Sequence, residues 1–426
     1  MTISPARKFR GRFGLPGDKS ISHRLAILGA LAQGPTRIGN FSAADDCAST
    51  LRCLEHLGLA IGRQGSEVVV EGRGPEALRA PSGVLDCGNS GTTLRLLAGV
   101  LAACPFEATL NGDASLQRRP VERVAAPLRA MGARLDSNAG RPPLRVTGAA
   151  LRGIDWTLEI ASAQVKTAVL IAGLRADGRT RVHEPQTSRD HTERLLPAMG
   201  VSVDREDGWL AVSAGTLHGI SMTVPGDVSS AAFLLIAALI AEDGEVRVED
   251  VSLNPGRVGF IDTLREMGAA LEVELTSDAP EPRGSITARS SRLRNVSIPP
   301  EKVASLVDEI PALAVAAAFA EGELRVSGAR ELRVKESDRI AALCEGLAAM
   351  GVRVEEREDG FSVHGGKRPR GARVRSFGDH RIAMAFAVAG LGCQPSTETA
   401  IEDSGSVAVS FPDFFERLTD ATLGDA

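Results

Sequence analysis

Tyrosine is absent from the 426 residues of this chain, and aromatic side chains of all kinds make up only 4% of it. Base-stacking platforms, on which single-stranded nucleic acids bind, are hard to build from so few rings. The net charge of −5 also lacks the basic excess that usually marks a nucleic-acid or anionic-membrane surface. We therefore expect a protein that binds neither nucleic acid nor membrane.

Long apolar runs are also missing. The longest two, Ala231–Ala241 and Ile310–Ala320, fall short of the roughly 18 residues that a membrane span needs, and they are typical of buried core helices. The first 13 residues carry four basic side chains but no apolar core, so they do not resemble a secretory signal. The six cysteines are scattered without a C-x-x-C pair, which favours reduced thiols in a cytoplasmic protein over disulfides or a zinc site.

Common nucleotide and metal motifs are absent as well. The chain has no G-x-x-x-x-G-K-[ST] loop and no G-x-G-x-x-G directly after a predicted strand, so ATP- or NAD-dependent chemistry is disfavoured. His191 and Glu193 lack the second histidine of H-E-x-x-H, and we interpret them as residues that bind no metal.

One phrase recurs along the chain: an apolar helical pattern, then Met-Gly or Leu-Gly, then a β-branched or apolar stretch. Its glycines stand where a left-handed helix cap would precede a strand; they are Gly58, Gly132, Gly200, Gly268 and Gly351. Successive glycines are 74, 68, 68 and 83 residues apart, which favours a true repeat over the helix–glycine–strand joints common in α/β proteins. Each repeat would take about 70 residues, and the chain has room for six.

A longer repeat divides the chain in half. The stretch Leu15–Ala30 (LPGDKSISHRLAILGA) matches Val224–Ile240 (VPGDVSSAAFLLIAALI). In both, a Pro-Gly-Asp turn is followed by a serine that we expect to cap an apolar helix. The two turns predict two similar domains that are entered at matching points. No low-complexity segment lies between them, so we expect a tight crossover instead of a flexible linker.

Several predicted helix starts carry cations where the helix dipole favours acids. They are PGDKSISHR with Lys19 and Arg24, GNSGTTLRLL with Arg95, SAQVKTAVL with Lys166, and GDHRIAMAF with Arg381. A single such cation is most simply a solvated surface charge. Several of them, next to free backbone N–H groups, indicate a shared pocket for a small molecule with several negative charges.

Carboxylates occur close to these cations in the sequence. The stretch Glu331–Ile340 (ELRVKESDRI) places Lys335, Glu336 and Arg339 within one predicted helical turn, with Lys335 and Arg339 on the same face. The stretch VDEIPA supplies Asp308 and Glu309 just before a proline and an apolar run. A carboxylate beside cations in a cleft can transfer protons, whereas the alternative for KESDR is an ordinary exposed helix start with salt bridges. The residues alone leave both interpretations open.

Together these stretches resemble the 5-enolpyruvylshikimate-3-phosphate (EPSP) synthase family over nearly the whole chain. The stretches that match, in family order and at family-like spacing, are LPGDKSISHR, GNSGTTLRLL, GDASLQRRPV, SAQVKTAVLIAGL, SRDHTER, VPGDVSSAAF, ELRVKESDRI, GDHRIAMAF and SFPDFF. The forms SRDHTER and GDASLQRRP are closer to the second class of these enzymes. The chain departs from the first class in having no active-site tyrosine, and in reading Ala408-Val409-Ser410 where that class has a lysine.

The resemblance implies an α/β (α+β) fold of two similar domains. Each would contain three βαβαββ-type repeats in an inverse β-prism, with the active site in the interdomain cleft. One domain is expected over residues 16–223, on the shikimate 3-phosphate side. The other combines residues 1–15 with residues 224–426 and would carry the catalytic carboxylates and the phosphoenolpyruvate side. The two Pro-Gly-Asp turns would be the crossovers.

The family transfers the enolpyruvyl group of phosphoenolpyruvate to the 5-hydroxyl of shikimate 3-phosphate, giving EPSP and phosphate, in aromatic amino acid (chorismate) biosynthesis. The resemblance implies these two substrates, no metal and no organic cofactor, and we expect a monomer. Two alternatives stay open: a UDP-N-acetylglucosamine enolpyruvyl transferase of the same fold, and an RNA-end-processing protein on the related repeat fold. The first would carry a cysteine in the loop that reads ASLQRR here, and an asparagine where this chain has Ser20.

Residue roles are implied by the matched motifs. Shikimate 3-phosphate is expected to contact Lys19, Ser20, Arg24, Ser162, Ala163, Gln164, Arg189, Asp308 and Lys335. Phosphoenolpyruvate is expected to contact Lys19, Gly91, Arg119, Gln164, Arg339 and Arg381. Asp308 would take the 5-hydroxyl proton, and Glu336, together with Lys19, would handle the proton at the methylene carbon.

Overall fold

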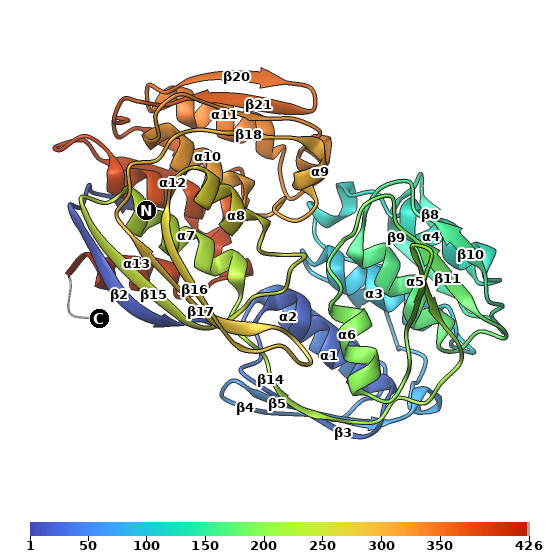
Figure 1. Cartoon of the computed structure of the whole chain (residues 1–426). Helices are drawn as coiled ribbons and strands as arrows, with labels where there is room; N and C mark the ends of the chain where they lie inside the picture. The colour runs from blue at the N-terminus through green and yellow to red at the C-terminus, as the bar shows by residue number, and fades with distance from the viewer. Residues whose placement is uncertain (424–426) are drawn as a thin grey trace. The chain divides into compact units, whose positions relative to one another are not determined.

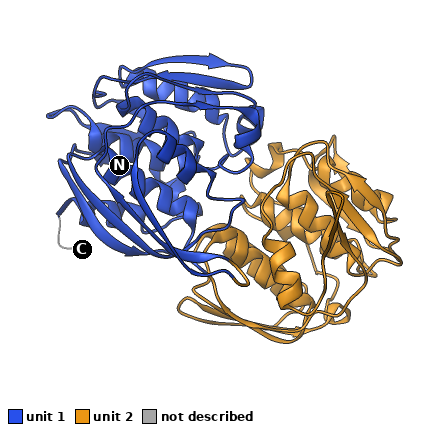
Figure 2. Ribbon diagram, viewed as in Figure 1, with its two compact units in different colours: residues 1–16, 225–278, 282–426 blue, residues 17–224, 279–281 orange. Residues whose placement is uncertain are grey.

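The computed structural model describes residues 1–423, which form two compact units (Figure 2). Unit 1 consists of Met1–Pro16, Pro225–Asp278 and the chain from Pro282 onward. Unit 2 consists of Gly17–Val224 together with Ala279–Glu281. Each unit has a hydrophobic core of its own. None of the helices within residues 1–423 is both long and apolar enough to cross a membrane.

Unit 2 contains three four-stranded sheets that share one topology (Figure 1). In each sheet the first two strands are parallel, and the next two strands continue the sheet in antiparallel pairs. In spatial order they are β14 (Ser221–Thr223), β3 (Gln33–Gly39), β5 (Glu67–Arg73) and β4 (Ile61–Gln64); β6 (Leu85–Asp86), β7 (Glu107–Asn111), β9 (Arg141–Thr147) and β8 (Arg134–Asn138); and β10 (Asp155–Thr157), β11 (Thr180–His183), β13 (Trp209–Val212) and β12 (Asp204–Glu206). Its α-helices are α1 (Lys19–Leu31), α2 (Asp45–His56), α3 (Gly91–Leu101), α4 (Glu122–Ala130), α5 (Ala163–Gly173) and α6 (His191–Ala198).

Unit 1 repeats the same topology in two of its three sheets. These are β2 (Lys8–Gly14), β15 (Asp243–Ser252), β17 (Arg283–Arg289) and β16 (Ala270–Ser277); and β18 (Ser297–Ile298), β19 (Glu323–Val326), β21 (Gly360–His364) and β20 (Arg353–Arg357). The third has three strands, β22 (Arg373–Arg375), β23 (Thr399–Glu402) and β1 (Thr2–Ile3). Its α-helices are α7 (Val228–Ile240), α8 (Gly259–Glu266), α9 (Pro300–Val303), α10 (Ile310–Phe319), α11 (Arg339–Ala349), α12 (His380–Gly392) and α13 (Phe414–Leu423).

The six sheets confirm the predicted repeat. Within a complete repeat the chain runs strand, helix, strand, helix, strand, strand, as in β6, α3, β7, α4, β8 and β9. The sixth repeat is shorter because the chain continues from β23 toward α13 without a final hairpin, and β1 takes a place beside β23. The five glycines of the recurring phrase have φ angles from 81° to 114°, the left-handed conformation expected of helix caps.

Three helices in each unit are buried along nearly their whole length. In unit 1, α7, α10 and α12 pack against one another, and all 13 residues of α12 are buried. In unit 2, α3 packs against both α1 and α5. Among the described α-helices, these six and α11 have no acidic residue in the first turn, whereas α2, α4, α6, α8, α9 and α13 each have at least one. Helix starts without acids are therefore found at all six buried inner helices and at α11, which begins with Arg339.

The two Pro-Gly-Asp turns stand where the chain leaves one unit and enters the other. Strand β2 precedes the first turn but pairs with β15 inside unit 1. Strand β14 precedes the second turn but pairs with β3 inside unit 2. Each unit thus receives the first strand of its first sheet from a distant part of the chain.

The aspartates of these turns, not the serines, cap the helices that follow. Asp18 accepts a hydrogen bond from Ile21 N at 3.0 Å, and Asp227 accepts one from Ser229 N at 2.8 Å. The predicted serine caps were wrong, because Ser20 and Ser229 are the second residues of α1 and α7. An aspartate earlier in the chain already supplies the capping oxygen, and its negative charge also suits the helix dipole.

Gly17 shows how closely the first turn is packed. A Cβ atom at this position would overlap the backbone carbonyl oxygen of Asn40, so only glycine fits between the turn and the end of β3.

We predict that Gly17→Ala lowers the free energy of unfolding by roughly 1 to 3 kcal/mol, because backbone must shift to admit the methyl group. Urea unfolding measures this change. Gly14→Ala is the matched control, since nothing lies within 4 Å of a Cβ at that position. Equal unfolding midpoints for the two variants would contradict the prediction.

Candidate functional site

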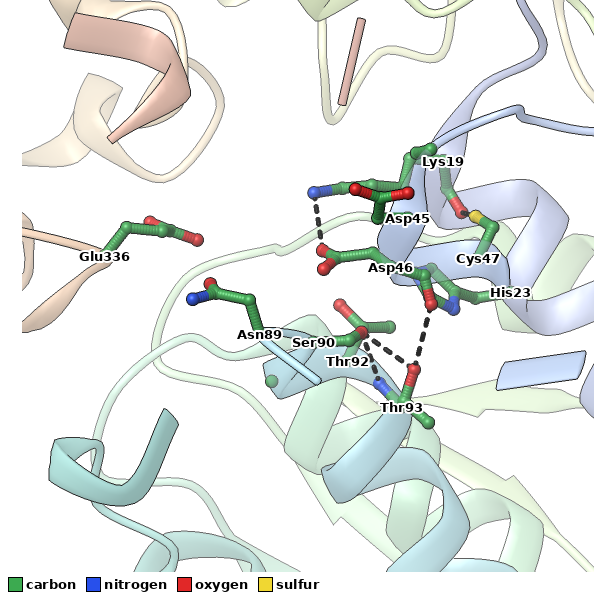
Figure 3. Close-up of polar contacts among 12 residues, drawn as sticks. Lys19, His23, Asp45, Asp46, Cys47, Asn89, Ser90, Thr92, Thr93 and Glu336 are labelled. Atoms are coloured by element: carbon green, nitrogen blue, oxygen red, sulfur yellow. Dashed lines mark hydrogen bonds and ion pairs between the residues drawn. The ribbon is translucent and has the colours of Figure 1, made fainter. Parts of the chain in front are cut away.

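Three helix starts of unit 2 come together at Lys19 (Figure 3). Lys19 is the first residue of α1, and its Nζ lies 2.9 Å from Oδ2 of Asp46 in the first turn of α2. Only 16% of the lysine side chain and 8% of the aspartate side chain are exposed. Because α1 has no acid in its own first turn, the carboxylate that orients Lys19 comes from the next helix. The sequence did not single out Asp46, since acids are ordinary in a first turn.

A row of buried hydroxyls joins the same three helices behind the ion pair. Ser90 caps α3 by accepting a hydrogen bond from Thr93 N at 3.1 Å. The Thr93 hydroxyl lies 2.7 Å from the hydroxyl of Thr50 in α2. That hydroxyl in turn lies 2.7 Å from Nδ1 of His23 in α1. The row holds the starts of α2 and α3 in place relative to α1.

The start of α5 is bound to the start of α3 through Gln164. Arg95 Nη1 donates to Gln164 Oε1 at 2.7 Å, and Gln164 Nε2 donates to Thr92 Oγ1 at 2.9 Å. Gly91 begins α3, and a Cβ there would lie 2.6 Å from Arg95 Nη1 and 3.4 Å from Arg119 Nη1. Two guanidinium groups therefore lie beside the backbone of Gly91, at a helix start, where an anion is favoured.

Arg119 is held by two polar neighbours. Its Nη2 donates to Asn89 Oδ1 at 2.5 Å and to Ser115 Oγ at 3.2 Å. Asn89 in turn donates to Asp113 Oδ2 at 2.7 Å, so the amide orients the guanidinium from a fixed position. The sequence did not identify Asn89 as a partner of Arg119, because an asparagine next to glycines is also ordinary turn chemistry.

Arg24 lies inside unit 2 and is only 2% exposed. Its guanidinium donates to the hydroxyls of Thr192 at 2.9 Å and Thr167 at 3.0 Å. Burial lowers the pKa of Arg24 to about 10; the charge of Glu193 opposes this shift, and the charge of Arg189 adds to it. Arg24 and Arg189 thus repel each other, and an anionic ligand would relieve that repulsion.

The start of α5 contains two of the predicted substrate residues. Ser162 caps this helix by accepting a hydrogen bond from Val165 N at 3.4 Å, and Ala163 is the first helical residue. Lys166 was grouped with the ligand-facing cations, and this was wrong: its side chain is 1% exposed and pairs with Glu184 and Glu193. Two buried carboxylates neutralise its charge within the unit.

In unit 1, Arg339 is the centre of a buried ion cluster. Its contacts are Nε to Asp379 Oδ2 at 2.8 Å, Nη2 to Glu336 Oε2 at 2.6 Å, and Nη1 to Asp308 Oδ1 at 3.5 Å. Burial acts to lower the pKa of Arg339, but the three carboxylates together outweigh burial and raise the pKa above its ordinary value. The two expected proton-transfer carboxylates are therefore bound to one guanidinium.

Asp379 connects this cluster to α12. It caps the helix by accepting a hydrogen bond from Arg381 N at 2.9 Å, and it also accepts one from Ser337 Oγ at 3.2 Å. The side chain of Arg381 donates from Nη1 to the backbone oxygen of Asp308 at 2.9 Å. The sequence singled out Arg381 but not the central position of Asp379, whose partner Arg339 is 40 residues away.

Lys335 lies outside the helix that was predicted to contain it. Asp338 caps α11 by accepting a hydrogen bond from Ala341 N at 3.0 Å, so the helix begins at Arg339. The prediction that Lys335 and Arg339 share a helical face was wrong, because Lys335 has an extended backbone (φ −80°, ψ −151°) before the cap. Its Nζ lies 3.2 Å from Glu331 Oε1.

Both units thus place cations at helix starts, and unit 1 adds three carboxylates bound to one of them, Arg339. Fixed cations can stabilise phosphate and carboxylate charge, and carboxylates can accept and return protons. In the described part of the chain, no three or more His, Cys, Asp and Glu side chains are grouped so that they could hold a metal ion. The arrangement suits a reaction between small anionic substrates.

Comparisons with known proteins agree with this chemistry. A family model described as EPSP synthase (3-phosphoshikimate 1-carboxyvinyltransferase) matches residues 3–418. A 3-phosphoshikimate 1-carboxyvinyltransferase of Halorhodospira halophila is 50% identical, over 99% of this chain and 96% of that protein. One of Desulforudis audaxviator is 48% identical, over 99% of both chains. The solved EPSP synthase of Acinetobacter baumannii is 43% identical, with a TM-score of 0.87 over 99% of this chain and 97% of that one.

The buried imidazole of His23 gives a prediction for pH. Burial lowers the pKa of His23 well below its usual value, and the charges of Lys19 and Arg24 lower it further. Below about pH 6.5 the unfolded chain binds a proton at this residue, whereas the folded chain resists protonation. The free energy of unfolding therefore falls by up to about 1.4 kcal/mol for each unit by which the pH is lowered in this range.

We therefore predict that His23→Asn reduces the fall in unfolding free energy between about pH 6.5 and pH 5. Urea unfolding of both proteins across this range measures the two slopes. Parallel slopes would show that His23 does not titrate as described.

Proposed function

Because the chain belongs to the EPSP synthase family, we propose that the two clusters described above bind the substrates of 3-phosphoshikimate 1-carboxyvinyltransferase. The enzyme transfers the enolpyruvyl group of phosphoenolpyruvate to the 5-hydroxyl of shikimate 3-phosphate and releases phosphate, a step of aromatic amino acid biosynthesis. The observation that carries the residue assignment is the buried Arg339, which binds both Asp308 and Glu336.

Shikimate 3-phosphate is assigned mainly to unit 2. The proposed residues are Lys19, Ser20, Arg24, Ser162, Ala163, Gln164 and Arg189, with Asp308 and Lys335 from unit 1. The repulsion between Arg24 and Arg189 supports this assignment, since phosphate or carboxylate oxygens would relieve it. The start of α5 supports it as well, because Ser162 and Ala163 lie at its N-terminus, where the helix dipole favours an anion.

Phosphoenolpyruvate is assigned to Lys19, Gln164, Gly91 and Arg119 of unit 2 and to Arg339 and Arg381 of unit 1. The two guanidinium groups beside Gly91 support the first part of the assignment. The second part is supported by the fixed orientation of two guanidinium groups: that of Arg339 donates to Asp379, and that of Arg381 donates to the backbone oxygen of Asp308. Groups already held in place need little rearrangement to stabilise charge in a transition state.

The proposed chemistry moves protons at two atoms, the 5-hydroxyl oxygen and the methylene carbon of phosphoenolpyruvate. Asp308 takes the proton of the 5-hydroxyl as the oxygen bonds to C2 of phosphoenolpyruvate, while the methylene carbon receives a proton from Glu336 or Lys19. The tetrahedral intermediate that results then loses phosphate, and the same methyl carbon returns a proton to restore the double bond. Fixed cations stabilise the phosphate and carboxylate charge throughout.

Location and oligomeric state are also part of the proposal. The six cysteines are all buried and free, which supports a reducing compartment such as the cytoplasm. The proposed site needs no residue of a second copy, so a monomer suffices for the proposed reaction.

The acceptor assay tests the function directly. We expect phosphate release from phosphoenolpyruvate with shikimate 3-phosphate as acceptor and none above background with UDP-N-acetylglucosamine. The reverse preference would assign the chain to the other enolpyruvyl transferase reaction, and activity with neither acceptor would refute the proposal.

Lys19→Met tests the residue assigned to both substrates. Removing the cation should lower kcat/KM by about 100- to 1,000-fold while the protein remains folded, because charge stabilisation in the transition state is lost. Steady-state kinetics and circular dichroism measure the two effects. Lys302→Met serves as a control, since Lys302 forms an exposed pair with Glu266 in unit 1. A folded Lys19→Met enzyme as active as the control would refute the role.

A further inference from the structure

A buried ion triad in unit 2 has no part in the chemistry described above. Lys166 Nζ lies 2.7 Å from Glu184 Oε2 and 2.7 Å from Glu193 Oε1. The side chains of Lys166 and Glu193 are each 1% exposed, and that of Glu184 is 7% exposed. Taking three charges out of water is expensive, and such groups often contribute little to stability in return. A role other than stability would account for the triad.

The triad fixes both ends of one loop. Glu184 directly follows β11, and Glu193 is the third residue of α6, so the segment between them is anchored twice on one ammonium group. Glu184 also accepts hydrogen bonds from the backbone N of Ser188, at 3.3 Å, and from the Ser188 hydroxyl. The next residue in the chain is Arg189, which is assigned to shikimate 3-phosphate.

The same triad joins this loop to the start of α5. Lys166 N donates to the backbone oxygen of Ser162 at 3.0 Å, in the first turn of the helix. A second link runs beside it, because the hydroxyls of Thr167 in α5 and Thr192 in α6 lie 2.7 Å apart and both accept from Arg24. The loop with Arg189, the start of α5 and Arg24 are therefore held as one assembly.

We propose that Lys166 is a positioning residue for shikimate 3-phosphate: it holds Glu184 and Glu193 so that Arg189 stays in place relative to Ser162 and Gln164. The inference rests on the proposed function, since it takes these residues as the shikimate 3-phosphate site. Lys166 touches neither substrate. Its loss should weaken binding of shikimate 3-phosphate and leave the phosphoenolpyruvate residues of α3 and α12 unaffected.

The test compares variants that remove the triad with one that only loosens α6. Lys166→Met alone would bury two carboxylates without their cation, which costs several kcal/mol. The triple variant Lys166→Met/Glu184→Gln/Glu193→Gln removes all three charges together. Glu184→Gln alone keeps the pair of Lys166 with Glu193 and changes the contacts of residue 184 to Lys166 and to Ser188. The matched control is Leu196→Ala, a fully buried position on α6 outside the triad.

Calorimetric titration gives the Kd of shikimate 3-phosphate, and steady-state kinetics give the KM of each substrate. For the triple variant we expect a Kd raised about tenfold or more, with the KM of phosphoenolpyruvate and kcat at saturation within about twofold of wild type. For Glu184→Gln we expect a Kd raised about threefold, and Lys166→Arg should retain most of the wild-type affinity. Leu196→Ala should lower the melting temperature without a change in Kd.

Wild-type Kd in a folded triple variant would overturn the inference, as would an equal loss of affinity in Leu196→Ala. If the triple variant does not fold, a wild-type Kd in Glu184→Gln would overturn it instead. In each of these cases the proposed function stands, because the wild-type enzyme still binds its substrate. A wild-type protein that binds no shikimate 3-phosphate would overturn both.

Discussion

The inner helices of each unit are buried along nearly their whole length, and this constraint decides where polar chemistry can occur. A helix in an apolar core satisfies its backbone groups internally except at its ends. In α12 every residue is buried, so the polar groups that it can offer are those near Asp379 and Arg381 at its start. The same holds for α1, where Lys19 stands at the first position. Candidate site residues gather at helix starts because the rest of each inner helix is packed away.

The helix starts differ in how their cations are balanced. Lys19 is paired with Asp46 of a neighbouring helix, and Arg339 is surrounded by three carboxylates. Arg24, by contrast, lies close enough to Arg189 for the two charges to oppose each other. The first arrangement orients a cation before any ligand arrives, and the second leaves an unfavourable charge interaction that an anion can remove. Binding and orientation are thus assigned to different residues.

Patterns that lie within a few residues of one another could be predicted from the sequence, and pairings between distant residues could not. The glycine caps and the six repeats follow from local spacing, and the structure confirms them. The residues around Asp379 could not be grouped, because the Arg339 side chain that binds it is 40 residues away. Lys166 was misassigned for the same reason, since nothing near it in sequence indicates that it forms buried ion pairs with Glu184 and Glu193. The helix limits at Ser20 and Lys335 were wrong because aspartates at neighbouring positions are the caps.

The pairing of β2 with β15 has a consequence for the order in which the chain folds during synthesis. The two strands are 235 residues apart, and nearly all of unit 2 lies between them in the chain. At about 5 to 20 residues per second, a ribosome needs roughly 12 to 47 seconds to reach β15 after it has made β2. Unit 2 receives its last strand, β14, before that moment. The first residues to be made are therefore among the last to join a sheet. Unit 2 can complete its sheets before unit 1 does.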